Sequence, residues 1–213
     1  MMINKTRLCG LYVLTDQTLM PAPHLLSEVE AALQGGARLV QYRDKHSAAS
    51  VRLTQAQQLR ALCQRFGALF LVNDDVALAQ AVDADGVHLG QSDMPLPQAR
   101  ALLGPDKLIG ITCHASLALA YQAVAQGADY LAFGAFYPSV TKPQAASAPL
   151  ALLHQAKQQL SLPLCAIGGI TADNAAPLVA AGADLLAVTA GVFASADTQQ
   201  AAAQLARLYA ISA

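Results

Sequence analysis

The 213-residue sequence carries little charge and no tryptophan. It has 13 lysine and arginine residues against 14 aspartate and glutamate residues, a formal net charge of −1. A nucleic-acid-binding domain presents a basic patch, so this balance argues against a polyanion as partner. Alanine is abundant instead, at about one residue in five, which favours helices packed closely against another layer.

Long hydrophobic runs are also missing, although 54% of the residues are apolar. The stretch 108–128 has no Asp, Glu, Lys or Arg, but it contains Gly110, Thr112 and His114. A membrane-spanning helix needs about 20 consecutive, predominantly apolar residues. The first seven residues show no apolar segment leading to a cleavage site. We therefore expect a soluble chain in the cytoplasm.

The few cysteines form no CxxC pair; they are Cys9, Cys63, Cys113 and Cys165. Scattered single cysteines suit reduced thiols better than a disulfide framework or a zinc site. We expect them to act as small buried hydrophobic residues.

Short apolar runs recur along the chain and alternate with stretches of helical spacing. The runs are nearly continuous, which is typical of strands covered on both faces. Eight of them are predicted as strands: 10–15, 39–42, 69–72, 86–89, 107–112, 130–133, 164–167 and 185–189. Three helix-to-strand joints share a glycine able to adopt positive φ: Gly35-Gly36-Ala37, Gly127-Ala128-Asp129 and Gly182-Ala183-Asp184.

Eight rounds of strand and helix argue for parallel strands joined by right-handed crossovers. Closing them gives an α/β fold of the (β/α)8 TIM-barrel type, with a doubly wound open sheet as the alternative. We predict one domain over residues 1–213, because no linker or block of charge divides the chain. A barrel carries its chemistry at the carboxyl ends of the strands, and the joints before the strands are structural.

Polar clusters follow four of the predicted strands, at 41–45, 73–75, 91–93 and 139–142. In the first cluster Gln41, Arg43 and Lys45 point to one side of an extended segment. Two cations and an amide there suit a phosphorylated ligand with a hydrogen-bonding ring. An exposed basic strand end is the alternative interpretation.

Asp74 and Asp93 end neighbouring predicted strands, so together they could bind one divalent ion. Two carboxylates with waters and phosphate oxygens form the usual shell of Mg²⁺. Asp75 is better suited to cap the following helix. Exposed aspartates are common at loop starts, so a pair without a metal stays open.

Small residues follow the last two predicted strands, at Gly168-Gly169 and Ala190-Gly191. Small residues expose backbone N–H groups, and barrels often bind a phosphate between these two loops. The sequence thus predicts two anion sites, one metal-assisted and one without metal.

The histidines and cysteines give weaker signals. His88, inside a predicted strand, is expected to be a hydrogen-bonded core residue, whereas His114 could reach the mouth of the barrel. Cys113 lies near the mouth, but no base is paired with it, which argues against a nucleophile. The remaining histidines are assigned to helices or the surface: His24, His46 and His154.

Six motifs stand in order, each after a predicted strand: Gln-x-Arg-x-Lys, Asn-Asp-Asp, Gly-Val-His-Leu-Gly-Gln-x-Asp, Gly-x-Thr-x-His, Pro-Ser-x-Thr-Lys and Ile-Gly-Gly-Ile. Together they make the chain resemble the thiamine-phosphate synthase family over nearly its whole length. Each motif alone is modest, but six in register are specific.

The resemblance implies a transferase that joins 4-amino-2-methyl-5-hydroxymethylpyrimidine diphosphate to a thiazole phosphate, giving thiamine phosphate and diphosphate, with Mg²⁺ as cofactor. It implies that the pyrimidine diphosphate is held by Gln41, Arg43, Lys45, Asn73 and Lys142, and Mg²⁺ by Asp74 and Asp93. It further implies that the thiazole phosphate is bound by Ser139, Thr141, Gly169, Thr189 and Ala190. Arg43, Lys45 and Lys142 would be catalytic, because they stabilise the charge of the departing diphosphate.

Three positions depart from the family pattern. Ser139 stands where the family has Thr, and Thr112, a predicted substrate-binding residue, stands where the family has Ser. Both positions therefore keep a hydroxyl. Thr189-Ala190-Gly191 replaces Val-Ser-Ala and loses one. The phosphate contact after the last strand would then rest on backbone N–H groups.

Other functions remain open. A TenI-like thiazole tautomerase would use a histidine such as His114 and need no metal, but an isomerase expels no diphosphate and does not need the charged set at the strand ends. A barrel that only binds thiamine precursors would not need a metal site tuned to a leaving group. A homo-oligomer is also open, because the alanine-rich helices could pack on a partner subunit or on the barrel.

Overall fold

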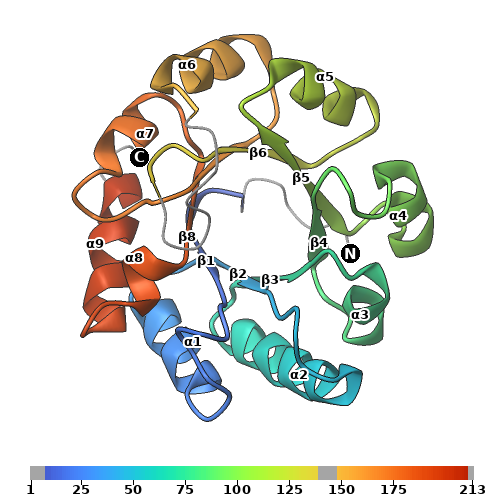
Figure 1. Cartoon of the computed structure of the whole chain (residues 1–213), viewed down its shortest axis with the longest axis vertical. Coiled ribbons are helices and arrows are strands. Elements are labelled where there is room, and N and C mark those ends of the chain that lie inside the picture. The colour runs from blue at the N-terminus through green and yellow to red at the C-terminus, as the bar shows by residue number, and fades with distance from the viewer. Residues whose placement is uncertain (1–7, 139–147, 211–213) are drawn as a thin grey trace.

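We describe residues 8–138 and 148–210 of a computed structural model of the chain. Within them, eight parallel strands pair in chain order and close into a barrel, with β8 returning to β1 (Figure 1). The strands are β1 (Gly10–Leu14), β2 (Leu39–Tyr42), β3 (Leu69–Asn73), β4 (Gly86–Leu89), β5 (Leu108–His114), β6 (Tyr130–Gly134), β7 (Leu164–Ile167) and β8 (Leu185–Val188). The predicted TIM barrel is confirmed, and the open-sheet alternative is wrong.

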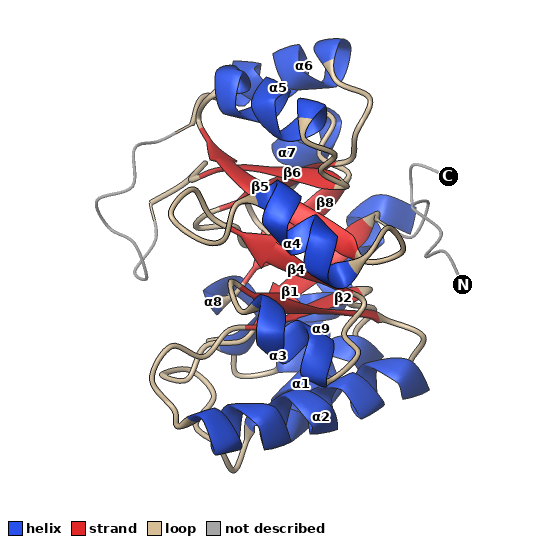
Figure 2. Cartoon of the chain, turned by 90° about the vertical axis from the view of Figure 1, so that its right-hand side faces the viewer, coloured by secondary structure: helices blue, strands red, loops and turns tan. Residues whose placement is uncertain are grey.

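Helices surround the barrel on its outside (Figures 1 and 2). The helices are α1 (Leu25–Gln34), α2 (Ala49–Arg65), α3 (Val76–Ala81), α4 (Leu96–Leu103), α5 (Leu117–Ala125), α6 (Leu150–Gln159), α7 (Ala176–Ala180), α8 (Ala190–Phe193) and α9 (Thr198–Ala210). The last helix, α9, packs against α1 and so joins the end of the ring to its beginning. Among the described residues, no helix has the length and apolarity to cross a membrane.

Both faces of the strands are buried, which explains their continuous apolar runs. In β1, Leu11 and Val13 pack in the layer between strands and helices, while Tyr12 and Leu14 belong to a second cluster inside the barrel. The cysteines follow the same pattern: all four are free thiols and three are buried, namely Cys63, Cys113 and Cys165. The prediction of buried hydrophobic cysteines is confirmed for these three.

Two predicted strands end one residue early, before Thr15 and Thr189. The Thr15 hydroxyl accepts the backbone N–H of Arg43, and Thr189 precedes the first residue of α8. Each threonine therefore already belongs to the loop that follows its strand. β5 instead runs two residues further than predicted, to His114, through a register shift against β6.

The joints before β4, β6 and β8 are structural, as the barrel hypothesis predicts. Each joint carries an aspartate whose carboxylate accepts a backbone N–H at 2.8 Å. The donor belongs to the strand before the joint: Phe70 in β3, Ile109 in β5 or Leu164 in β7. Each aspartate also forms an ion pair with a cation from a surrounding helix: Asp85 with Arg60, Asp129 with Arg100 and Asp184 with Lys157. The three pairs tie helices to the amino-terminal end of the barrel.

The predicted glycine joints are also present. Gly36, Gly127 and Gly182 have φ of 99°, 88° and 102°, a region that favours glycine. Each lies between the end of a helix and the next strand, so the sequence pattern identified these turns correctly.

Candidate active site

A cavity of about 370 Å³ opens at the carboxyl ends of the strands. Barrel enzymes place their chemistry at this end. Several of the predicted site residues line the cavity: Gln41, Arg43, Asn73, Thr112, Gly169, Thr189 and Ala190. Ser139, Thr141 and Lys142 fall outside the residues that the structure describes.

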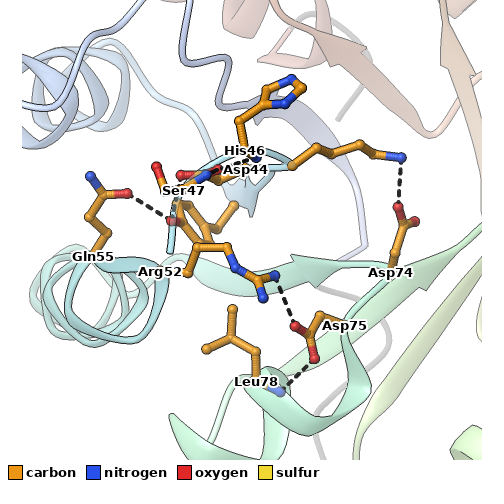
Figure 3. A network of polar contacts seen from close by, with 10 residues as sticks. Asp44, His46, Ser47, Arg52, Gln55, Asp74, Asp75 and Leu78 are labelled. Atoms are coloured by element: carbon orange, nitrogen blue, oxygen red, sulfur yellow. Dashed lines mark hydrogen bonds and ion pairs between the residues drawn. The ribbon is translucent and has the colours of Figure 1, made fainter. Parts of the chain in front are cut away.

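Lys45, Asp74 and Asp93 do not line the cavity itself but form a charged cluster next to it. The Lys45 ammonium lies 3.0 Å from the Asp74 carboxylate (Figure 3). Burial, together with the neighbouring Asp74, raises the pKa of the Asp93 carboxyl, while the Gly90 N–H donates to it at 2.6 Å. Lys45, Asp74 and Asp93 thus come from the ends of β2, β3 and β4 and meet at one edge of the mouth.

The donor set of this cluster fits a magnesium ion. The Asp74 carboxylate lies close enough to Asp93 to disfavour the charge of the Asp93 carboxyl, and a bound divalent cation would compensate this repulsion. Asp74 holds a left-handed backbone conformation, with φ of 62°, directly after β3. No group of three His, Cys, Asp or Glu side chains suited to a metal occurs in the described chain, so the remaining ligands would be water and phosphate oxygens.

Two residues after β1 hold the segment that carries Arg43. The Thr15 hydroxyl accepts the Arg43 N–H at 2.8 Å and donates to the Arg43 carbonyl at 3.2 Å. The Asp16 carboxylate lies 3.9 Å from the Arg43 guanidinium and also accepts the N–H of Thr18 at 2.9 Å. Thr15 and Asp16 line the cavity. Neither is predicted as a site residue from the sequence, because a single threonine and aspartate after a strand carry no spacing signal.

Asp44 and Asp75, the other acidic residues after β2 and β3, have structural roles. Asp44 accepts the backbone N–H groups of His46 and Ser47, which shapes the loop that presents Lys45 (Figure 3). Asp75 accepts the N–H of Leu78 at 2.9 Å and pairs with Arg52 at 3.0 Å, so it caps α3 as predicted.

The loops after β7 and β8 lie so close to neighbouring backbone at Gly169 and Gly191 that neither position has room for a side chain. A Cβ on Gly169 would lie 2.3 Å from the Pro138 carbonyl oxygen, and a Cβ on Gly191 would lie 2.1 Å from that of Ile170. This close packing brings the backbone of both loops to the cavity wall. The glycines predicted for an anion site therefore have a steric reason to be there.

A chain of polar side chains crosses the floor of the cavity, inside the barrel. The Gln41 amide donates to the Tyr12 hydroxyl at 2.5 Å, and the Tyr12 hydroxyl lies 3.0 Å from that of Tyr130. The Tyr130 hydroxyl lies 2.8 Å from His88 Nδ1, and His88 Nε2 lies 2.8 Å from the Thr112 hydroxyl. His88 is buried and hydrogen-bonded as predicted, but it also lines the cavity.

The other candidate side chains divide by exposure. His114 is exposed at the end of β5 and lines the cavity, so it does reach the mouth. Burial raises the pKa of the Cys113 thiol to about 12, which leaves no thiolate near neutral pH. The burial of Cys113 argues against a nucleophile at this position, as the sequence also does.

The fold and the cavity define a class of protein, a TIM-barrel enzyme whose site suits phosphorylated substrates and a divalent cation. The sequence matches the family described as thiamine monophosphate synthase over residues 11–192. The chain belongs to this family.

Individual relatives agree along almost the whole chain. It is 57% identical over 205 residues to the thiamine-phosphate synthase of Thioalkalivibrio sulfidiphilus, covering 96% of this chain and 97% of that protein. It is 54% identical over 201 residues to the thiamine-phosphate synthase of Thiobacillus denitrificans, covering 94% and 95%. The solved structure of thiamine phosphate pyrophosphorylase from Pyrococcus furiosus superposes with a TM-score of 0.89 at 36% identity, covering 98% of each chain. The family expected from the sequence motifs is confirmed.

Proposed function

We propose that this chain is a thiamine-phosphate synthase, with residues 1–213 as one catalytic domain. It joins 4-amino-2-methyl-5-hydroxymethylpyrimidine diphosphate to 4-methyl-5-(2-phosphoethyl)thiazole or its carboxylate form, and releases diphosphate. The observation that carries the proposal is the charged cluster of Lys45, Asp74 and Asp93 beside a cavity lined by Gln41 and Arg43. A diphosphate leaving group needs such a cluster, whereas an isomerisation does not.

The cluster has the composition of a diphosphate site. Asp74 and Asp93 would hold Mg²⁺, which when bound neutralises charge on the diphosphate. Arg43 and Lys45 would contact the diphosphate oxygens from one side, and Lys142 is proposed for the same task. Thr15 and Asp16 support this arrangement because they fix the backbone and the guanidinium of Arg43 before the substrate arrives.

The reaction breaks the bond between the pyrimidine methylene carbon and the diphosphate oxygen, and the electron pair leaves with the diphosphate. The electron-rich aminopyrimidine ring stabilises the resulting cation, and the thiazole nitrogen donates its lone pair to the same carbon. The protein therefore needs no strong base. Its tasks are to stabilise the departing charge and to hold the two rings face to face, and such orientation can lower the activation barrier by roughly 7–11 kcal/mol.

Water is the competing nucleophile, and apolar cavity walls would limit its access. Leu14, Ala132, Ile167 and Val188 contribute uncharged surface to the cavity from four different strands. Because the cation is captured by whichever nucleophile is adjacent, a dry wall next to a positioned thiazole favours the C–N bond over hydrolysis.

We place the thiazole phosphate at the loops after β7 and β8, with Gly169, Thr189 and Ala190 as proposed contacts and Ser139 and Thr141 completing the site. The support is the close approach of both glycine-containing loops to the cavity. Thr189 and Ala190 offer no side chain of strong phosphate affinity, so backbone N–H groups would make the contact. The free thiols fit a reducing compartment, and we propose a cytoplasmic enzyme.

One assay tests the proposal against its rivals. The protein is incubated with both precursors and Mg²⁺, and thiamine phosphate and diphosphate are quantified. Equal amounts of both products, lost in excess chelator, are expected. Conversion of a thiazole carboxylate phosphate alone, without metal, would identify a tautomerase acting through His114, which lines the cavity. Binding of the precursors without either reaction would identify a binding protein.

A further inference from the structure

The polar chain on the cavity floor contains two tyrosines that carry no role in the proposed reaction. Tyr130 is 0% exposed and Tyr12 is 1% exposed, and their rings meet edge to face at a centroid distance of 6.1 Å. Burial raises the pKa of both phenols well above their ordinary value, so each hydroxyl keeps its hydrogen. A buried hydroxyl donates one hydrogen bond, and a chain of such groups therefore has a direction.

The sequence reserves the space for Tyr130. Gly110 on β5 stands opposite Tyr130 in the strand register, and a Cβ on Gly110 would lie 2.0 Å from the Tyr130 ring. A tyrosine inside the barrel is thus accommodated at the expense of a side chain on the neighbouring strand. A phenylalanine would fill the same volume without a polar group to satisfy, so volume alone does not account for the hydroxyl.

The direction of the chain follows from its first donor. The Gln41 amide nitrogen donates to the Tyr12 hydroxyl, and Tyr130 is the only other hydrogen-bond partner of that hydroxyl in the described chain. We therefore assign the Tyr12 hydrogen to the contact with Tyr130. The Tyr130 hydrogen then points to His88 Nδ1, which must accept. A neutral imidazole that accepts at Nδ1 carries its hydrogen on Nε2, which donates to Thr112.

We propose that Tyr130 is a positioning residue that fixes His88 as the Nε2–H tautomer through this directional chain. The same chain fixes the hydrogen-bond roles of Gln41 and Thr112 towards the ligand ring. Gln41 then presents its amide oxygen as an acceptor, and Thr112 presents its hydroxyl as a donor. Both residues line the cavity, whereas Tyr130 does not. Tyr130 therefore acts without touching substrate.

This polarity matches one ligand chemistry and opposes another. An aminopyrimidine offers an exocyclic N–H donor and ring-nitrogen acceptors, which complement an acceptor at Gln41 and a donor at Thr112. In the 4-oxo analogue a carbonyl oxygen replaces the amino group. This oxygen and the Gln41 amide oxygen are both hydrogen-bond acceptors and would repel each other. This part of the inference rests on the proposed function, since that function supplies the aminopyrimidine.

The tautomer is measured directly on the wild-type protein. Long-range ¹H–¹⁵N NMR of the ¹⁵N-histidine-labelled protein distinguishes a protonated Nδ1 from a protonated Nε2, and a His88→Gln sample assigns the signal. We expect His88 as neutral Nε2–H. A Nδ1–H tautomer or an imidazolium at neutral pH would overturn the inference, and this result does not depend on turnover.

The coupling is tested with Tyr130→Phe against Tyr209→Phe, which removes a hydroxyl that donates to the Ala183 carbonyl at the opposite end of the barrel. In Tyr130→Phe the His88 signal should shift towards a tautomer mixture, and in Tyr209→Phe it should not. An unchanged pure Nε2–H signal in Tyr130→Phe would refute a role for that hydroxyl. If Tyr130→Phe does not fold, Tyr12→Phe breaks the chain one bond earlier. It separates Tyr130 from the first donor, so it should also shift the His88 signal towards a tautomer mixture, and it should loosen Gln41.

The ligand consequence is measured as binding, without the thiazole. Calorimetric titration with the 4-amino and 4-oxo pyrimidine diphosphates gives a preference ratio for each protein. We expect Tyr130→Phe, or Tyr12→Phe in its place, to lower the preference for the amino compound by about tenfold, and Tyr209→Phe to leave it unchanged. An unchanged ratio in Tyr130→Phe, or in the substitute Tyr12→Phe, would refute the polarity claim. If the wild-type protein forms no thiamine phosphate while Tyr130→Phe lowers the preference ratio, only the proposed function would be refuted.

Discussion

At the scale of single residues, the negative charge of the Asp93 carboxylate is only partly compensated by its neighbours. Burial and the neighbouring Asp74 raise the pKa of its carboxyl, and Lys45, 3.0 Å from Asp74, compensates only part of the negative charge. A carboxylate with a raised pKa costs stability when it ionises, because the folded protein disfavours its charged form. The arrangement makes sense if a cation is to be held there.

Asp93→Asn should therefore separate activity from stability. We expect turnover to fall by about 100-fold or more, because a metal ligand is lost, while the melting temperature of the metal-free protein does not fall below that of wild type. Steady-state kinetics with saturating Mg²⁺ and calorimetric melting measure both.

Asp83→Asn is the matched control for Asp93→Asn. Asp83 has an exposed side chain paired with Lys107 away from the cavity. Its variant should keep turnover within about twofold and change stability by less than about 1 kcal/mol. Full activity of Asp93→Asn would refute the metal role of that residue.

At the scale of elements, the barrel separates stabilising residues at one end from chemistry at the other. The ion pairs before β4, β6 and β8 lie at the amino-terminal end, and the charged cluster and the cavity lie at the carboxyl end. This division could be predicted, because strand-to-helix loops and helix-to-strand joints alternate along the chain. Substitutions at the amino-terminal end should therefore change stability, and substitutions at the carboxyl end should change activity.

Asp129→Ala should act on stability alone. Asp129 is buried, pairs with Arg100 and accepts the Ile109 N–H at 2.8 Å, so its removal leaves both groups without that partner. We expect a loss of about 3 kcal/mol, or about 6–12 °C in melting temperature. Turnover at 25 °C should be unchanged. A shift no larger than that of Asp83→Asn would contradict the proposed contribution.

Gly169→Ala should act on the site, and Gly67→Ala provides its control. The two glycines have nearly the same left-handed φ, 62° and 64°. A Cβ at position 169 would lie 2.3 Å from the Pro138 carbonyl oxygen, but one at position 67 would meet nothing within 4 Å. Both variants should lose about 1 kcal/mol from backbone strain. Gly169→Ala should lose more, because its new Cβ would also approach the Pro138 carbonyl oxygen. Only Gly169→Ala should raise the KM for the thiazole phosphate, by about tenfold. Equal kinetics in the two variants would contradict a role of this loop.

At the scale of the whole molecule, the site is assembled from strands far apart in the chain, so ligand binding should stabilise the closed barrel. Mg²⁺ and diphosphate are proposed to bind as one unit at the ends of β2, β3 and β4. A ligand at 100 times its dissociation constant stabilises the folded state by about 2.7 kcal/mol.

Mg²⁺ and diphosphate together should raise the melting temperature by about 5–10 °C, and each alone by much less. Differential scanning calorimetry of wild type and of Asp93→Asn measures this without turnover. The variant should lose most of the shift. An equal shift with diphosphate alone would indicate an anion site that does not use the metal.

Much of this protein follows from local sequence. Runs such as 39–42, 86–89 and 164–167 match β2, β4 and β7 residue for residue, because a strand buried on both faces must be continuously apolar. The side chains at the strand ends could be assigned to one face because a parallel barrel brings all its carboxyl ends together. The predicted end of β1 is wrong by one residue, because a threonine such as Thr15 fits both strand and loop.

Only the tertiary structure decided how the cavity floor is made. Gln41, Tyr12, Tyr130, His88 and Thr112 come from five strands. Only Gln41 and Thr112 are predicted from the sequence as binding residues, and Tyr12 and Tyr130 belong to the apolar cluster inside the barrel. Their partners lie between 24 and 118 residues away, and no local pattern encodes such pairs. Periodicity tells which way a strand faces, but only closure of the ring determines which inward-facing groups touch.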